Sequence, residues 1–240
     1  MTKALALDSY PPAAEEKAWQ ILEQMPAQDF YLAQNPQGLW QLCREGIKPL
    51  HIDFSGAHYR HRGGTEYLPK AFKGMAGGSI IDATAGWGRD AWLLAYRGFR
   101  LTLCERNPYL YILLKQAVEQ ARELPLTAAV AARIEIVHHD SRDFLTASGA
   151  QADAIYLDPM YPQRQKSAKV KKDMQILHAL LGADAGEQSD NAQLLDSALN
   201  SGCPRIVVKR PHSAEHLGGI APHHSIAAPN TRFDIYLSRI

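Results

Sequence analysis

The sequence lacks the features that mark several large classes of protein. Only three cysteines occur in 240 residues, far apart and without a CxxC pair, so a small disulfide scaffold is excluded and reduced thiols are expected. No stretch approaches about 18 consecutive apolar residues, and no apolar leader follows a basic start, so we expect neither a membrane span nor a secretory signal. These absences together predict a cytoplasmic protein.

Charge of one sign is not in excess either. The 26 basic and 25 acidic side chains leave a net charge of +1, which excludes an obligate polybasic tail. With 46% hydrophobic residues, the chain has enough apolar surface for a self-sufficient core. Its length predicts one large domain, or one domain with an appendage.

Residues 1–78 are expected to form a small α+β domain. Helical spacing over residues 13–25 predicts a first helix, and residues 65–76 are expected to form a linking helix. Four short apolar runs predict two antiparallel hairpins: Tyr31–Gln34 with Leu39–Cys43, and Leu50–Phe54 with His58–Arg62.

Residues 79–240 are expected to form a second, larger domain, because short apolar segments there alternate with helical ones. The strand candidates are Ser79–Ala83, Arg100–Glu105, Arg133–Val137, Asp153–Leu157 and Arg205–Lys209. The helix candidates between them include residues 89–97, 108–123, 172–181 and 191–200. This alternation predicts an α/β fold with a parallel sheet covered on both faces. His224–Ala228 and Arg232–Leu237 add an antiparallel hairpin. Five parallel strands followed by such a hairpin form the layout of the Rossmann-like class I methyltransferases.

A glycine loop joins the first of these strands to its helix. Asp82 lies near the end of the strand, and Gly86 and Gly88 allow a tight turn whose backbone N–H groups can approach a ligand beyond the strand ends. Glu105 ends the second strand, where a carboxylate can accept hydrogen bonds from both ribose hydroxyls of a nucleoside. The loop and this carboxylate together predict a nucleoside-containing cofactor.

Two cofactors fit this pattern, because the same glycine spacing occurs in dinucleotide-binding proteins. The pyrophosphate of NAD needs a positive helix end, but Asp82 and Asp90 flank the loop and oppose an anion, although Arg89 partly offsets them. The amino-acid end of S-adenosylmethionine carries an ammonium and a carboxylate, which suit mixed charges. We therefore favour S-adenosylmethionine and keep an NAD-dependent oxidoreductase as the alternative.

The third strand is followed by Asp140 and Ser141. In the predicted topology this strand end lies over the adenine, where Asp140 can accept from the exocyclic amine and Ser141 can meet a ring nitrogen. The alternative is that Asp140 only caps a short helix over residues 141–147.

The fourth strand delivers the motif Asp158-Pro159-Met160-Tyr161-Pro162 to the same edge of the sheet. An exocyclic amine of a nucleobase is a poor nucleophile because its lone pair is delocalised into the ring. The Asp158 carboxylate and the Pro159 carbonyl can each accept one of its N–H groups, and Tyr161 offers an aromatic face on which an unstacked base can lie. These three residues are the predicted catalytic group.

Basic residues cluster on both sides of this motif. Residues 164–173 contain five basic side chains and one acidic one, and residues 60–73 carry a net charge of +3. Lys209 and Arg210 end the fifth strand on the same edge. The predicted RNA contacts are Arg60, Arg62, Arg164, Lys166, Lys169, Lys171, Lys172, Lys209 and Arg210. The near-zero net charge therefore hides a basic surface around the catalytic motif.

One motif argues for different chemistry. Residues 212–216 match the HxxEH pattern of zinc peptidases, which requires a stable helix. Pro211 precedes this segment and Gly218-Gly219 follows it within two turns, so we expect no helix there and no metal site.

As a set, the motifs resemble the ribosomal RNA small subunit methyltransferase J family. The matching segments are residues 51–54, 82–90, 105–108, 158–162, 166–172, 207–211 and 232–236. The resemblance implies transfer of a methyl group from S-adenosylmethionine to the N2 amine of one guanosine in small-subunit (16S) ribosomal RNA. It also implies a cofactor site lined by Arg89, Asp90, Glu105, Arg106, Asp140, Ser141 and Asp158. A non-catalytic RNA-binding module with a relic pocket is a third hypothesis.

Overall fold

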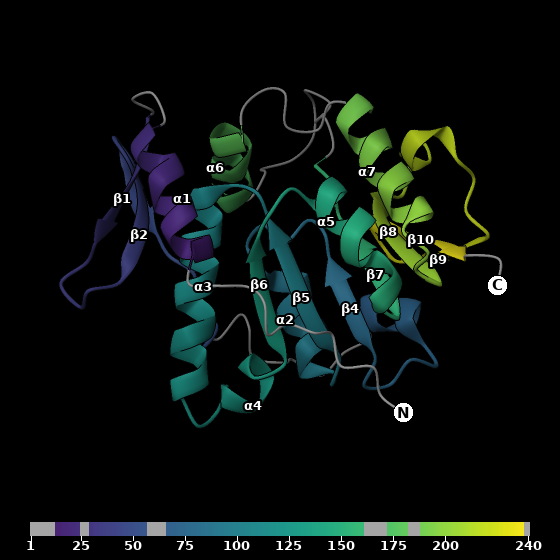
Figure 1. Cartoon of the computed structure of the whole chain (residues 1–240), viewed down its shortest axis with the longest axis horizontal. Helices are drawn as coiled ribbons and strands as arrows, with labels where there is room; N and C mark the ends of the chain where they lie inside the picture. Colours follow the sequence, from purple (N-terminus) through teal and green to yellow (C-terminus); the bar gives the residue numbers. More distant parts are fainter. Residues whose placement is uncertain (1–12, 25–28, 57–65, 161–171, 182–187, 238–240) are drawn as a thin grey trace.

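A computed structural model of the chain describes residues 13–24, 29–56, 66–160, 172–181 and 188–237. These residues form a three-stranded antiparallel sheet and a seven-stranded mixed sheet. Figure 1 shows the small sheet at one end of the molecule and the C-terminal strands at the other.

The large sheet has the strand order β6-β5-β4-β7-β8-β10-β9. Its parallel strands are β4 (Ser79–Asp82), β5 (Arg100–Glu105), β6 (Ile134–His138), β7 (Ala154–Leu157) and β8 (Arg205–Pro211). β10 (Thr231–Leu237) pairs antiparallel with both β8 and β9 (His224–Ala227), so it lies between them. The predicted fold class, five parallel strands with a C-terminal antiparallel hairpin, is confirmed.

Helices cover both faces of this sheet. The longer ones are α2 (Arg89–Tyr96), α3 (Pro108–Glu123), α5 (Ser141–Ser148), α6 (Lys172–Leu181) and α7 (Gln188–Asn200). The shorter ones are α4 (Ala128–Ala131), η1 (Leu68–Phe72), η2 (Gly149–Gln151) and η3 (Leu217–Gly219). α5 and α7 lie together in front of the sheet in Figure 1, and α6 lies beyond the carboxyl ends of the strands.

Alternation along the strands creates two apolar layers. Ile80 and Tyr156 point into the layer formed with α2 and α3, whereas their neighbours Ile81 and Leu157 point into the layer formed with α5 and α7. Successive side chains of a strand face opposite sides, so a strand covered on both faces must be apolar throughout. This explains why the parallel strands are recognisable in the sequence as short continuous apolar runs.

The N-terminal part contains α1 (Ala13–Gln24), β1 (Phe30–Gln34), β2 (Trp40–Arg44) and β3 (Ile47–Leu50). The prediction of a strand over Leu50–Phe54 is wrong, because the third strand ends at Leu50. Asp53 Oδ1 accepts hydrogen bonds from the backbone and hydroxyl of Ser55, which makes a turn there. Phe54 instead stacks on Trp92 of α2, with ring centroids 4.4 Å apart.

Two other predictions for this region have different outcomes. The predicted linking helix over residues 65–76 is only the five-residue 3₁₀ helix η1. The predicted strand His58–Arg62 lies outside the described residues. Phe30, Leu42 and Phe54 belong to the same apolar cluster as α2 and α3, so the small sheet shares a core with the large one. The domain boundary after residue 78 stays a prediction.

No helix in the described ranges is both long and apolar enough to cross a membrane.

Candidate active site

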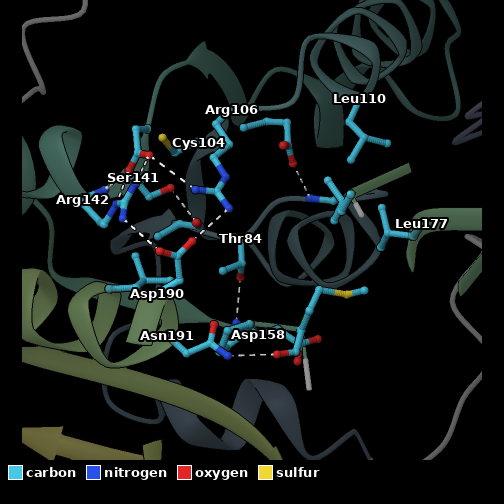
Figure 2. Close-up of a pocket in the computed structure, with 18 residues that line it drawn as sticks. Thr84, Cys104, Arg106, Leu110, Ser141, Arg142, Asp158, Leu177, Asp190 and Asn191 are labelled. Atoms are coloured by element: carbon cyan, nitrogen blue, oxygen red, sulfur yellow. Dashed lines mark hydrogen bonds and ion pairs between the residues drawn. The ribbon is translucent and has the colours of Figure 1, made fainter. Parts of the chain in front are cut away.

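A cavity opens at the carboxyl ends of β4, β5, β6 and β7 (Figure 2). Its polar lining comes from the carboxyl ends of these strands, the segments that follow them and the start of α7, and its apolar lining from α3, α6, α7 and Met160. The polar members include Thr84, Glu105, Arg106, Asp140, Ser141, Arg142, Asp158, Asp190 and Asn191, and the apolar ones include Leu110, Met160, Leu177, Leu181 and Leu194. In open α/β sheets, ligands bind at this edge.

The two glycines of the loop after β4 have different roles. Gly86 lines the cavity at a φ of +52°. Gly88 has a φ of +69° and caps α2, and a Cβ there would lie 2.7 Å from Leu114 Cδ2 and 3.1 Å from Phe54 Cζ. Gly88 is therefore required by packing within the protein, while Gly86 leaves room beside the ligand position.

Glu105 is held at the end of β5 by backbone groups. Its Oε2 accepts from Gly86 N–H at 3.0 Å, and its Oε1 accepts from Asn107 N–H at 2.8 Å. Burial raises the pKa of this carboxyl to about 7. Each carboxylate oxygen has two lone pairs, so each keeps one for a further donor. That arrangement suits two neighbouring hydroxyls.

Asp140 caps α5, as the alternative interpretation predicted. Its Oδ1 accepts from Arg142 N–H at 2.9 Å, and its Oδ2 contacts Arg142 Nη2 at 2.7 Å. These bonds from Arg142 lower the pKa of the Asp140 carboxyl to about 2. Ser141 Oγ donates to the backbone oxygen of Ala83 at 2.6 Å. Both residues line the cavity, and their contact with an adenine stays a prediction.

A group of ion pairs at the cavity was not predicted from the sequence. Arg106 contacts Asp140 at 3.6 Å and Asp190 at 3.4 Å, and Arg142 contacts Asp190 at 3.3 Å. Figure 2 shows Arg106, which follows β5, converging with Arg142 of α5 and Asp190 of α7. Asp190 lies 84 residues after Arg106 in the chain, so no local pattern signals the pair.

The Asp158 loop is fixed from three sides. Asp158 N–H donates to Thr84 Oγ1 at 2.7 Å, Lys209 Nζ donates to Asp158 Oδ2 at 2.8 Å, and Asn191 Nδ2 donates to the backbone oxygen of Met160 at 3.1 Å. Asp158 and Pro159 both line the cavity. Tyr161, the third predicted catalytic residue, lies outside the described residues.

Asp82, Arg89 and Asp90 do not line the cavity. Asp82 is buried and accepts from the backbone and hydroxyl of Thr84 at 3.0 and 3.3 Å, and burial raises its pKa to about 7. Asp90 Oδ2 accepts from the Tyr156 hydroxyl at 2.6 Å and from Lys209 Nζ at 2.7 Å. Asp82 and Asp90 thus bond to other groups of the protein. Direct contact of Asp82, Arg89 and Asp90 with a cofactor stays a prediction.

The predicted RNA contacts have been only partly located. Six of them lie outside the described residues: Arg60, Arg62, Arg164, Lys166, Lys169 and Lys171. Lys172 begins α6. Lys209 lies between two carboxylates, and Arg210 is buried and donates from Nε and Nη2 to the backbone oxygen of Glu215. Both residues thus have partners inside the protein, and their contact with RNA stays a prediction.

Metal and thiol chemistry find no support among the described residues. Residues 212–216 form no helix, as expected, and no group of three potential metal ligands occurs in the described ranges. All three cysteines are free and buried, and burial raises the pKa of the Cys104 thiol to about 12. A thiol with such a high pKa is a poor nucleophile at neutral pH.

The cavity fits S-adenosylmethionine. Glu105 offers two acceptors for the ribose hydroxyls, and Leu110, Leu177 and Leu194 offer apolar surface for an adenine. Acidic and basic side chains both reach the cavity, as a zwitterionic amino-acid group requires.

Comparison with known proteins supports the same cofactor. The profile of a family described as "Putative SAM-dependent methyltransferase" matches residues 15–238. Fold and site therefore define an S-adenosylmethionine-dependent methyltransferase, and the NAD alternative is set aside.

The curated relatives identify the family more closely. A protein named Ribosomal RNA small subunit methyltransferase J, from Desulfotalea psychrophila, is 40% identical over 199 residues, 80% of this chain and 74% of the relative. A protein of the same name from Chromohalobacter salexigens is 38% identical over 221 residues, 87% of this chain and 85% of the relative. The chain belongs to the ribosomal RNA small subunit methyltransferase J family. A solved SAM-dependent methyltransferase from Neisseria gonorrhoeae has 34% identity and a TM-score of 0.71, covering 96% of this chain and 93% of that one.

Proposed function

We propose that this enzyme transfers the methyl group of S-adenosylmethionine to the exocyclic N2 of a guanosine in small-subunit (16S) ribosomal RNA. One observation carries the proposal: the Asp158 loop lies at the rim of the cavity that also contains Glu105. Lys209 donates to Oδ2 of Asp158, and no described residue donates a hydrogen bond to its other oxygen, Oδ1. Oδ1 thus remains an acceptor for the amine that this proposal brings to the methyl donor.

The protein's own residues have two functions in the reaction: to bind the amine of the guanine and to accept a proton from it. The lone pair of a guanine amine is delocalised into the ring, so the Asp158 carboxylate and the Pro159 carbonyl accept its two N–H groups and localise the lone pair on nitrogen. After the new N–C bond forms, the nitrogen must lose a proton, and the Asp158 carboxylate accepts it. S-adenosylmethionine, when bound, supplies an already activated methyl group on a sulfonium. Positioning and exclusion of water therefore supply most of the rate.

We assign recognition of the RNA to Tyr161 and to the two basic segments of the sequence. Tyr161 follows Met160 directly and offers a stacking surface worth about 1–3 kcal/mol for an unstacked base. We assign contacts with the flanking phosphates to the basic residues at 164–172 and at 60–62. A substrate of this kind is consistent with the cytoplasmic location that the reduced cysteines predict. The curated relatives are named for the same substrate class.

A methyl-transfer assay tests the proposal. The protein is incubated with methyl-labelled S-adenosylmethionine and small ribosomal subunits that lack the modification, and the RNA is digested to nucleosides. We expect the label on N2-methylguanosine. We expect an Asp158→Ala variant to bind the cofactor but to transfer the methyl group at least about 10²-fold more slowly. Label on another atom, or none, would disprove the guanine-N2 assignment. Undiminished transfer by Asp158→Ala would show that Asp158 is not catalytic.

A further inference from the structure

Lys209 joins two carboxylates that come from different elements. Its Nζ lies 2.7 Å from Oδ2 of Asp90 on α2 and 2.8 Å from Oδ2 of Asp158 after β7. All three side chains are partly buried. The Tyr156 hydroxyl donates to the same Asp90 oxygen at 2.6 Å, which fixes Asp90 from the opposite side.

The Lys209 ammonium has used most of its hydrogen-bond donors. An ammonium group has three N–H donors, and Asp90 and Asp158 take two of them. A lysine that binds an RNA phosphate needs its ammonium exposed on a solvated surface. Lys209 would have to break a charge-assisted bond, or use its one remaining N–H, to do so. Its geometry favours an internal role.

The charges around Asp158 show what that role is. Burial raises the pKa of the Asp158 carboxyl, and Lys209 opposes this shift while Asp90 reinforces it. The other charged groups that act on Asp158 in the described part of the chain include Arg210 on β8, which favours its ionised form, and Asp82 on β4, another carboxyl. Without the ammonium of Lys209, two carboxylates would face each other in a partly dry site.

We propose that Lys209 is a positioning residue for methyl transfer: it keeps Asp158 ionised and binds Oδ2, so that Oδ1 remains directed toward the amine of the substrate. This inference rests on the proposed function of Asp158. It replaces the role in phosphate binding that the sequence suggested for Lys209. Asp90 and Tyr156 are then the groups that hold Lys209 in place.

A titration without substrate tests the electrostatic part of the proposal. The protein is labelled with ¹³C at the aspartate carboxyl carbons, and the Asp158 resonance is assigned by its loss in Asp158→Asn. We expect its pKa to rise in Lys209→Met and to return toward the wild-type value in Lys209→Arg. An unchanged pKa in Lys209→Met would overturn the proposal. Because no RNA is present, this result does not depend on whether guanine N2 is the target.

Kinetics then test the catalytic part. In Lys209→Met we expect kcat to fall about 10²-fold, with little change in the KM for S-adenosylmethionine, and the acid limb of the pH–rate profile to move to higher pH. Adding Asp90→Asn removes the second carboxylate, so the double variant should recover about tenfold of the lost rate. Lys115→Met removes a lysine from the outer part of α3, where it pairs with Glu119, and is the matched control.

RNA binding separates the proposal from the alternative. If Lys209 bound a phosphate, Lys209→Met would weaken RNA binding and lower the slope of log K against log salt by about one. We expect both to be unchanged. A smaller salt slope together with an unshifted pH–rate profile would contradict the positioning role. Thermal unfolding and cofactor calorimetry confirm that each variant is folded, and Lys209→Arg provides a second test if Lys209→Met does not fold.

Discussion

The Thr84 hydroxyl connects the two loops of the active site: Oγ1 accepts the backbone N–H of Asp158 at 2.7 Å. The same hydroxyl lies 3.3 Å from Asp82 Oδ1, to which it donates its hydrogen. A buried carboxyl of β4 thereby orients a hydroxyl that holds the loop after β7. The position of Asp158 thus depends on a residue of the glycine loop, 74 residues earlier in the chain.

Replacing Thr84 tests this connection. Thr84→Val keeps the shape of the side chain and removes the hydroxyl, which leaves the Asp158 N–H without its acceptor. The loss of one hydrogen bond corresponds to about 1 kcal/mol, so we expect kcat to fall roughly 5- to 10-fold. Thr84→Ser keeps the hydroxyl and should retain most of the activity. Equal rates for the two variants would contradict the role of this bond.

Cofactor binding should depend on pH through Glu105. Its pKa is raised to about 7 by burial, and only the ionised carboxylate has all its lone pairs for the ribose hydroxyls. Affinity for S-adenosylmethionine should therefore increase as the pH rises through about 7 and then level off, as calorimetry between pH 6 and pH 8.5 would measure. Glu105→Gln should bind about 10- to 100-fold more weakly, with little pH dependence. A pH-independent wild-type affinity would contradict this assignment.

The free energy of unfolding should depend on pH through the carboxyl of Asp82. Its folded pKa of about 7 exceeds the ordinary value of 3.8, so the folded state binds a proton more tightly than the unfolded state. The resulting stabilisation is full below about pH 4 and is lost as the pH rises through about 7. Asp82→Asn keeps an oxygen for Thr84 without the charge. It should match the wild type near pH 4 and exceed its free energy of unfolding at pH 8 by up to about 4 kcal/mol. Denaturant unfolding at both pH values measures the difference.

The two loop glycines should respond differently to alanine. Gly88→Ala adds a Cβ only 2.7 Å from Leu114, at a positive φ, and we expect a loss of about 2–3 kcal/mol in unfolding free energy. In Gly86→Ala the nearest atom lies 3.7 Å away, so only backbone strain of about 1 kcal/mol remains. Gly86→Ala should change cofactor affinity more than stability. Thermal unfolding measures the stability of both variants, and calorimetry measures their cofactor affinity. A larger loss of stability in Gly86→Ala than in Gly88→Ala would contradict these assignments.

The sequence predicted the large sheet well for a physical reason. Parallel strands buried on both faces contain continuous apolar runs, such as β7 and the segment Ile206–Val208 of β8, that stand out between amphipathic helices. The small sheet was harder to predict. The segment Leu50–Phe54 alternates like a strand, but the turn formed by Asp53 and Ser55 ends the pairing and turns Phe54 into the core.

Contacts within a local motif of the site could be predicted from the sequence, whereas contacts between distant partners could not. The position of Glu105 follows from its place at the end of a strand, and the cap formed by Asp140 involves residues only two positions apart. The contacts of Lys209 with Asp90 and Asp158 span 119 and 51 residues, so its basic neighbour Arg210 suggested a surface patch instead. Asn191 was missed for the same reason, since it reaches Met160 from α7.

The placement of β10 between β8 and β9 has a consequence for how the enzyme comes into being on the ribosome that makes it. Lys209 lies on β8, and until residues 231–237 have been synthesised this strand has no neighbour on the side that β10 later occupies. The cofactor cavity is lined by residues up to Leu194 of α7, whereas the support of the Lys209–Asp158 pair is complete only when β10 has paired with β8.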